Sequence, residues 1–87
     1  MGRRRYPPLT PSDVTAIVTA LGFSFKNQEG SHQHYERPAT GTTVRAVVTI
    51  DVSVSTFDEY LIKSMVRQST HTREEFYGAT KATKKKI

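Results

Sequence analysis

The feature that most constrains the fold of this chain is a change in the spacing of its apolar residues, from a helical period to strict alternation and back again. In the first segment the apolar residues have the i, i+3, i+4, i+7 spacing of one helix face: Val14, Ile17, Val18 and Leu21. Thr10, Pro11 and Asp13 have the form of a capping-box start, and Gly22 can adopt the left-handed conformation that ends a helix. The sequence therefore predicts a helix between Thr10 and Gly22.

Three alternating segments follow and predict three strands. The first covers residues 23–27, and residues 28–30 provide a turn before a second strand at about 31–37. After another turn at 38–41, alternating β-branched residues over 44–50 predict the third strand. Because short connections force neighbouring strands to pair, we expect an antiparallel meander.

Helical spacing returns after the third strand. Ser55 or Thr56 is the candidate N-cap of this second helix, with Asp58 or Glu59 three residues further on. We expect the helix to turn an apolar face towards the sheet: Phe57, Tyr60, Leu61, Ile62, Met65 and Val66. A further capping-box pattern begins at Thr72 and predicts a short last helical turn.

The order of these elements predicts an α+β fold with the arrangement α-β-β-β-α. A three-stranded antiparallel sheet needs a covering layer, so we expect both helices on one face of it. The predicted domain organisation is a single domain over residues 10–78. It lies between a flexible, basic and proline-rich segment at 1–9 and a disordered basic tail at 79–87.

Composition narrows the functional classes. The chain has 87 residues and no cysteine, which excludes disulfides, thiolate metal sites and a cysteine nucleophile. No segment approaches the roughly 20 apolar residues of a membrane span, and the basic start runs into prolines rather than an apolar stretch. We therefore expect a soluble cytoplasmic protein.

The formal net charge of +5 is carried by the two ends of the chain. Seven of the 13 basic residues lie at 3–5 and 81–86. The other six are outnumbered by the eight acidic residues of the chain. Basic tails of this kind bind nucleic acid in some proteins and are simply solvated in others, so the charge alone leaves both interpretations open.

The densest cluster of reactive side chains is the segment from Gly30 to Tyr35. Alternation places His32 and His34 on one face of the predicted strand, and Ser31 and Tyr35 on the other. Histidine takes and returns protons near neutral pH, which RNA cleavage by a ribose 2′-OH requires. A turn glycine and a hydroxyl could position the phosphate, although an exposed strand histidine is also a common surface residue.

A metal site is a weaker hypothesis for the same residues. Two histidines on one strand face usually need a third or fourth ligand, which Glu36 or Asp51 would have to supply, and His71 lies far along the chain. We expect neither a metal nor another cofactor.

The motifs resemble those of the HicA toxin family in order and spacing. The resemblance rests on Leu21-Gly22-Phe23, on Gly30-Ser31-His32 with Tyr35, on the residues 63–68 and on Glu74-Glu75-Phe76, and it covers about 13–76. It implies a fold like that of double-stranded-RNA-binding domains, an mRNA-cleaving endoribonuclease toxin, and a HicB-like antitoxin as partner. Because a metal site is the weaker hypothesis, we expect the cleavage to be metal-independent.

The resemblance also assigns roles to residues. It implies that His32 is the catalytic histidine. Gly30, Ser31, His34 and Tyr35 then become candidates for positioning phosphate and substrate. Many family members close the third strand with a Pro-x-His element, whereas this chain has Asp51 and Ser53 at that place.

RNA cleavage also requires a group that protonates the leaving 5′ oxygen, and the departure from the family element leaves open which group does so. His34, a lysine or water would have to act as the general acid. A non-catalytic RNA-binding module of the same fold, or a domain that only binds an antitoxin, therefore remains as an alternative.

Five basic residues are the candidate RNA contacts, because phosphate binding positions a substrate of this kind: Lys26, Arg37, Arg45, Lys63 and Arg67. Each alone could equally be a solvated charge. For Tyr35 the choice lies between stacking on a base and packing into the core.

Overall fold

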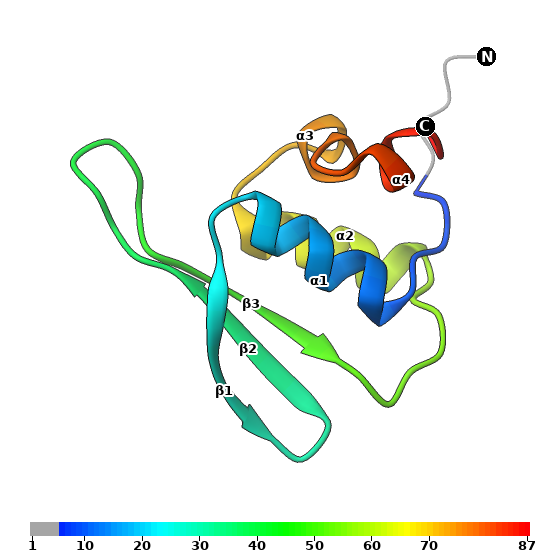
Figure 1. Ribbon diagram of the computed structural model, residues 1–87, viewed down its shortest axis with the longest axis horizontal. Coiled ribbons are helices and arrows are strands. Elements are labelled where there is room, and N and C mark those ends of the chain that lie inside the picture. Colours follow the sequence, from blue (N-terminus) through cyan, green and yellow to red (C-terminus); the bar gives the residue numbers. More distant parts are fainter. Residues whose placement is uncertain (1–5) are drawn as a thin grey trace.

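The computed structural model describes residues 6–87. Its elements follow one another as α1 (Pro11–Ala20), β1 (Ser24–Glu29), β2 (His32–Arg37), β3 (Ala46–Asp51), α2 (Glu59–Ser69), α3 (Arg73–Gly78) and α4 (Lys81–Lys84). Figure 1 shows the sheet on one side of the molecule and the helices gathered on the other. The predicted α+β arrangement with a three-stranded antiparallel sheet is confirmed.

The start of α1 follows the predicted capping box. The Thr10 hydroxyl accepts a hydrogen bond from the Asp13 backbone N–H at 3.1 Å, and the Asp13 carboxylate accepts one from the Thr10 N–H at 3.0 Å. These two bonds satisfy donors that the first turn of a helix leaves unpaired. At the other end Gly22 has φ +95°, which a residue with a side chain rarely adopts.

The sheet has the order β1-β2-β3, and its register fixes which residues share a face. Tyr35 lies opposite Val48 and His32 lies opposite Asp51. A bulge between Phe25 and Asn27 interrupts the pairing of β1 with β2. The sheet therefore has one face with Tyr35 and Val48, and another that carries His32 and Asp51.

The apolar face of the sheet and the helices form one core. Its residues are Leu9, Val14, Ile17, Val18, Phe23, Tyr35, Ala46, Val48, Ile50, Phe57, Ile62, Met65, Val66, Phe76 and Tyr77. Both α1 and α2 contribute side chains to this core and contact β3. Every second residue of β3 is buried, which is the alternation expected of a strand with one covered face.

The start of α2 differs from the prediction. Asp58, rather than Ser55 or Thr56, is the N-cap, and its carboxylate accepts a hydrogen bond from the Leu61 N–H at 2.9 Å. The reason is a tertiary contact: Phe57 donates its N–H to the Leu9 carbonyl at 2.8 Å and stays extended. The helix can therefore begin only after Phe57.

The buried face of α2 also differs at two positions. Tyr60 is 79% exposed and Leu61 is 38% exposed. Neither belongs to the core, although the sequence predicted both in the apolar face. Ile62, Met65 and Val66, which were predicted to belong to the same face, are buried. The buried face of α2 is centred on Ile62, Met65, Val66 and Ser69, which leaves Tyr60 in solvent and Leu61 at the margin of that face.

The two ends of the described chain are held against α3. The Tyr77 hydroxyl donates to the Pro7 carbonyl at 2.6 Å, and burial raises the pKa of Tyr77. Thr83 of α4 is 1% exposed and donates its hydroxyl to the Tyr77 carbonyl at 2.6 Å. Residues 81–84 thus form a docked helical turn where the sequence suggested disorder. Of the segment 1–9, residues 1–5 with the three arginines lie outside the described residues.

Candidate active site

The turn between β1 and β2 presents His32 to solvent. Gly30 has φ +60°, which allows the tight reversal, and Ser31 is the only residue between it and the first residue of β2. The His32 side chain is 55% exposed and lies on the polar face of the sheet. The local Gly-Ser-His sequence therefore places an accessible imidazole beside the hairpin turn.

Asp51 is the residue that faces His32 across the sheet. The two are direct partners in the register, and the His32 Nε2 atom lies 3.7 Å from the Asp51 Oδ2 atom. The sequence placed Asp51 at the position of a missing family element but did not identify it as a partner of His32. The signal that could have found it is the antiparallel register, which pairs the start of the second strand with the end of the third.

Asp51 is held as a carboxylate by its surroundings. The hydroxyl and the backbone N–H of Ser53 donate to Asp51 Oδ1 at 2.7 and 3.0 Å. These two hydrogen bonds, with smaller contributions from the Ser31 hydroxyl and the charge of His32, lower the pKa of Asp51. The residues Asp51 and Ser53 thus form a fixed negative charge beside the imidazole.

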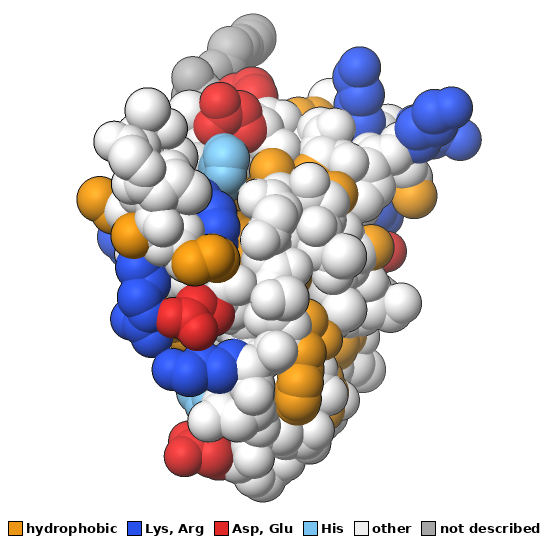
Figure 2. Space-filling model, turned by 60° about the vertical axis from the view of Figure 1, so that its left-hand side comes forward, with side chains coloured by type: hydrophobic (Ala, Val, Ile, Leu, Met, Phe, Trp, Pro, Cys, Tyr) orange, Lys and Arg blue, Asp and Glu red, His pale blue; other side chains and the backbone are white. Residues whose placement is uncertain are grey.

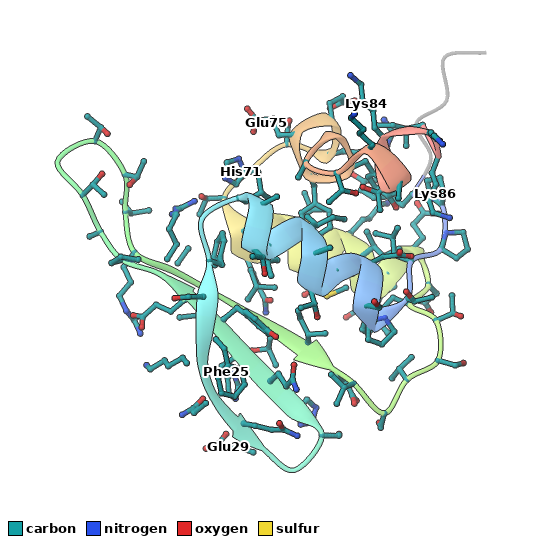
Figure 3. The ribbon with its side chains drawn as sticks, viewed as in Figure 1. Phe25, Glu29, His71, Glu75, Lys84 and Lys86 are labelled. Atoms are coloured by element: carbon teal, nitrogen blue, oxygen red, sulfur yellow. The ribbon has the colours of Figure 1, made fainter. Side chains whose placement is uncertain are left out.

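His34 lies on the same face as His32 but is already engaged. Its Nδ1 atom shares a hydrogen bond with the Thr49 hydroxyl at 3.0 Å, and its Nε2 atom lies 3.3 Å from a carboxylate oxygen of Glu29. Figure 3 shows Glu29 at the hairpin end of β1. These contacts fix the ring of His34 between two neighbouring strands.

A groove of about 250 Å³ opens between this face and α2. It is lined by His32, Thr49, Asp51, Val54, Phe57, Leu61, Ser64, Met65 and Gln68. The groove places the exposed imidazole next to an apolar surface, an arrangement that the sequence did not predict. It forms because α2 lies along the free edge of β3, where the Thr49 N–H donates to the side-chain amide oxygen (Oε1) of Gln68 at 3.1 Å.

Arg37 is tied into the protein. Its guanidinium donates to the carbonyls of Ser69 and Val44 and to the hydroxyl of Thr70, and it lies 5.1 Å from the centre of the Phe23 ring. These bonds join the end of β2 to the end of α2, so the geometry fits a structural role better than RNA contact. The sequence could not reveal this because the partners are far apart in the chain.

The other basic candidates fall into two groups. Arg45 forms an ion pair with Glu36, and Lys63 forms one with Glu59 at 3.2 Å. Figure 2 likewise shows basic and acidic side chains interleaved on one side of the molecule. The side chains of Lys26, in the bulge of β1, and of Arg67, exposed on α2, form no hydrogen bond or ion pair with the residues described here.

Tyr35 and His71 lie away from the groove. Tyr35 is buried, its ring meets the Phe25 ring edge-on at 5.8 Å, and its hydroxyl donates to Gln33. This places Tyr35 in the core rather than in position to stack on a base. His71 bonds to Glu75 at 3.1 Å beyond the end of α2, where Figure 3 shows the two side chains together.

Among the described residues there is neither a metal-binding cluster nor a membrane-spanning helix. Residues 6–87 contain no group of three or more His, Asp or Glu side chains arranged around a metal position. In the same part of the chain, no helix is long and apolar enough to cross a membrane.

The fold and the site together define a small α+β domain that presents a histidine and a carboxylate on the open face of a three-stranded sheet. The family described as "HicA toxin of bacterial toxin-antitoxin" matches residues 11–70 of the chain. The chain belongs to the HicA toxin family, and it is a toxin of a toxin–antitoxin system. A search of curated proteins finds no match.

Proposed function

We propose that this toxin is an endoribonuclease that cleaves mRNA, with His32 as the general base. The observation that carries the proposal is the placement of His32, exposed at the start of β2, opposite Asp51 and at the edge of a groove. An accessible imidazole can accept a proton from a substrate, and a neighbouring carboxylate stabilises the imidazolium that results.

In the proposed reaction His32 accepts the proton of a ribose 2′-OH. The 2′ oxygen then forms a bond to the adjacent phosphorus, and the bond from phosphorus to the 5′ oxygen breaks. The products are a 2′,3′-cyclic phosphate and a 5′-hydroxyl. This route has no step that requires a metal ion.

Three further roles complete the mechanism. Both ring nitrogens of His34 are engaged by Thr49 and Glu29, so we assign protonation of the leaving oxygen to water rather than to His34. Gly30 and Ser31, in the turn beside His32, are proposed to position the phosphate. Lys26 and Arg67 are the proposed phosphate contacts, because other described residues do not neutralise them.

A second candidate function is a non-catalytic RNA-binding module. The observation that favours it is that Asp51 and Ser53 stand where many family members have a Pro-x-His element. In both cases we propose a HicB-like antitoxin as the protein partner, and membership of a toxin–antitoxin family supports an antitoxin partner in general.

Growth and RNA integrity after induced expression separate the two candidates. The wild-type chain should arrest growth and fragment RNA, and His32→Ala should do neither, since loss of a general base costs roughly 10²- to 10⁴-fold in rate. His71→Gln serves as a control, because His71 is bound to Glu75 away from the groove. Normal growth and intact RNA with folded wild-type protein would support the binding module instead.

A further inference from the structure

The groove beside His32 has two chemically different parts. Its apolar lining consists of Val54, Phe57, Leu61 and Met65, and its polar lining includes Thr49, Ser64 and Gln68. No lysine or arginine is among these lining residues, and the charge of Asp51 at the groove is negative. A phosphate therefore finds no cation in the groove, whereas a flat, neutral ring with a polar edge matches both parts of the lining.

The orientation of Gln68 leaves hydrogen-bond donors free in this groove. β3 is the edge strand next to α2, and the outward-facing Thr49 N–H donates to the carbonyl oxygen of the Gln68 side chain. Because a backbone N–H can only donate, the amide oxygen must face Thr49 and the Nε2 group must face elsewhere. Among residues 6–87 this Nε2 group has no hydrogen-bond partner.

We propose that the groove is a nucleobase subsite for the nucleotide that supplies the attacking 2′-OH. Leu61 and Val54, the apolar lining residues that are not buried in the core, contact the base, and Gln68 Nε2 donates to an acceptor atom on its edge. This inference rests on the proposed function, because His32 lines the same groove and the base and the 2′-OH are attached to adjacent carbons of one ribose.

The size of the groove agrees with a single base. Pockets for drug-sized ligands have volumes of roughly 300–1,000 Å³, and this groove, which is open on one side, offers about 250 Å³. Leu61 is 38% exposed although the sequence predicted it in the apolar face of α2. A base in the subsite would cover the Leu61 side chain and accept a hydrogen bond from the exposed Nε2 group of Gln68.

The test uses RNA oligonucleotides in which only one nucleotide keeps its 2′-OH, so that cleavage is confined to one position. One version carries a normal base on that nucleotide and the other is abasic there. For the wild-type protein we expect kcat/KM to be at least about tenfold lower on the abasic RNA, since a lost binding group typically costs 10-fold or more.

Two variants assign that difference to the groove. Gln68→Glu keeps an oxygen to accept the Thr49 N–H but removes the donor, and Leu61→Ala removes apolar contact. Both should lower kcat/KM on the normal RNA and leave the slow abasic cleavage unchanged. Ala16→Glu adds the same charge as Gln68→Glu on the exposed side of α1 and should match the wild type on both substrates.

Binding measurements separate failure of the subsite from failure of the proposed reaction. The same RNAs, made uncleavable by a 2′-deoxy nucleotide at the reactive position, are titrated onto the wild-type and Gln68→Glu proteins. In one outcome the wild type cleaves no RNA, yet it binds the RNA with the normal base more tightly than the abasic RNA, and Gln68→Glu loses this preference. The proposed reaction is then wrong and the subsite stands. If cleavage is robust and Gln68→Glu and Leu61→Ala lower kcat/KM equally on both RNAs, the subsite is overturned.

Discussion

At the scale of single residues, the pairing of His32 with Asp51 is the feature on which the site depends. The hairpin turn exposes His32, and the register of β2 with β3 brings a carboxylate to 3.7 Å from its ring. The carboxylate is itself held by Ser53, so the imidazole faces a negative charge with a fixed position. A positioned partner of this kind orients a catalytic histidine.

The pH dependence of stability tests the environment of Asp51. Its pKa is lowered in the folded chain, so the ionised form stabilises the fold above the ordinary value of 3.8, and this stabilisation is lost as the pH falls through the lowered pKa. We expect the Tm of the wild type to fall more steeply than that of Asp51→Asn when the pH is lowered from about 5 to about 2.

Ser53→Ala provides the matched comparison for that experiment, because the Ser53 hydroxyl is the largest cause of the lowered pKa. Its acid sensitivity should lie between those of the wild type and Asp51→Asn. Identical pH profiles for all three proteins, measured by thermal denaturation, would contradict the described surroundings of Asp51.

At the scale of elements, the helix starts show where local sequence is sufficient. The capping boxes at Thr10 and Thr72 were predicted and are present, because each involves only residues three positions apart. The start of α2 was predicted wrongly, because the bond from the Phe57 N–H to the Leu9 carbonyl decides it. A contact between residues so distant in the chain leaves no local signal.

Substitution of the N-cap of α2 tests this account. Asp58→Ala removes the acceptor for the Leu61 N–H and should lower the free energy of unfolding by about 1 kcal/mol. Thr56→Ala, which changes an exposed residue before the helix, should have a much smaller effect. Urea denaturation monitored by circular dichroism measures both, and a larger loss for Thr56→Ala would contradict the assignment.

At the scale of the whole molecule, the ends of the described chain are part of the fold. Leu9 is completely buried, Tyr77 donates a hydrogen bond to Pro7, and Thr83 donates one to Tyr77. The sequence suggested flexible ends because polar and basic residues surround these anchors. Single buried residues within a polar segment are too few to produce a periodic pattern.

Tyr77→Phe tests the attachment of the N-terminal segment. The variant keeps the ring in the core but leaves the Pro7 carbonyl without its donor, and we expect a loss of about 1 kcal/mol in the free energy of unfolding. Limited proteolysis should cut near Pro7 faster in the variant. Unchanged stability together with unchanged proteolysis would show that this hydrogen bond does not hold the segment.

The fold was more predictable than the site. Alternation and helical spacing are repeated over many residues, so they predicted the element order and the antiparallel sheet. The Gly30-Ser31-His32 motif is local, so it could single out His32 as the candidate catalytic residue, and that role stays a prediction. The position of Asp51, the engagement of Arg37 and the groove depend on register and on how α2 lies along β3, which no local pattern encodes.

The central claim is that His32 promotes attack of a ribose 2′-OH on the neighbouring phosphate. The most direct measurement incubates purified wild-type and His32→Ala proteins with RNA and identifies the chemical groups at the new ends. The account predicts 2′,3′-cyclic phosphate and 5′-hydroxyl ends with the wild type, and no cleavage with His32→Ala. Cleavage by the variant at the wild-type rate, or 5′-phosphate ends, would contradict it.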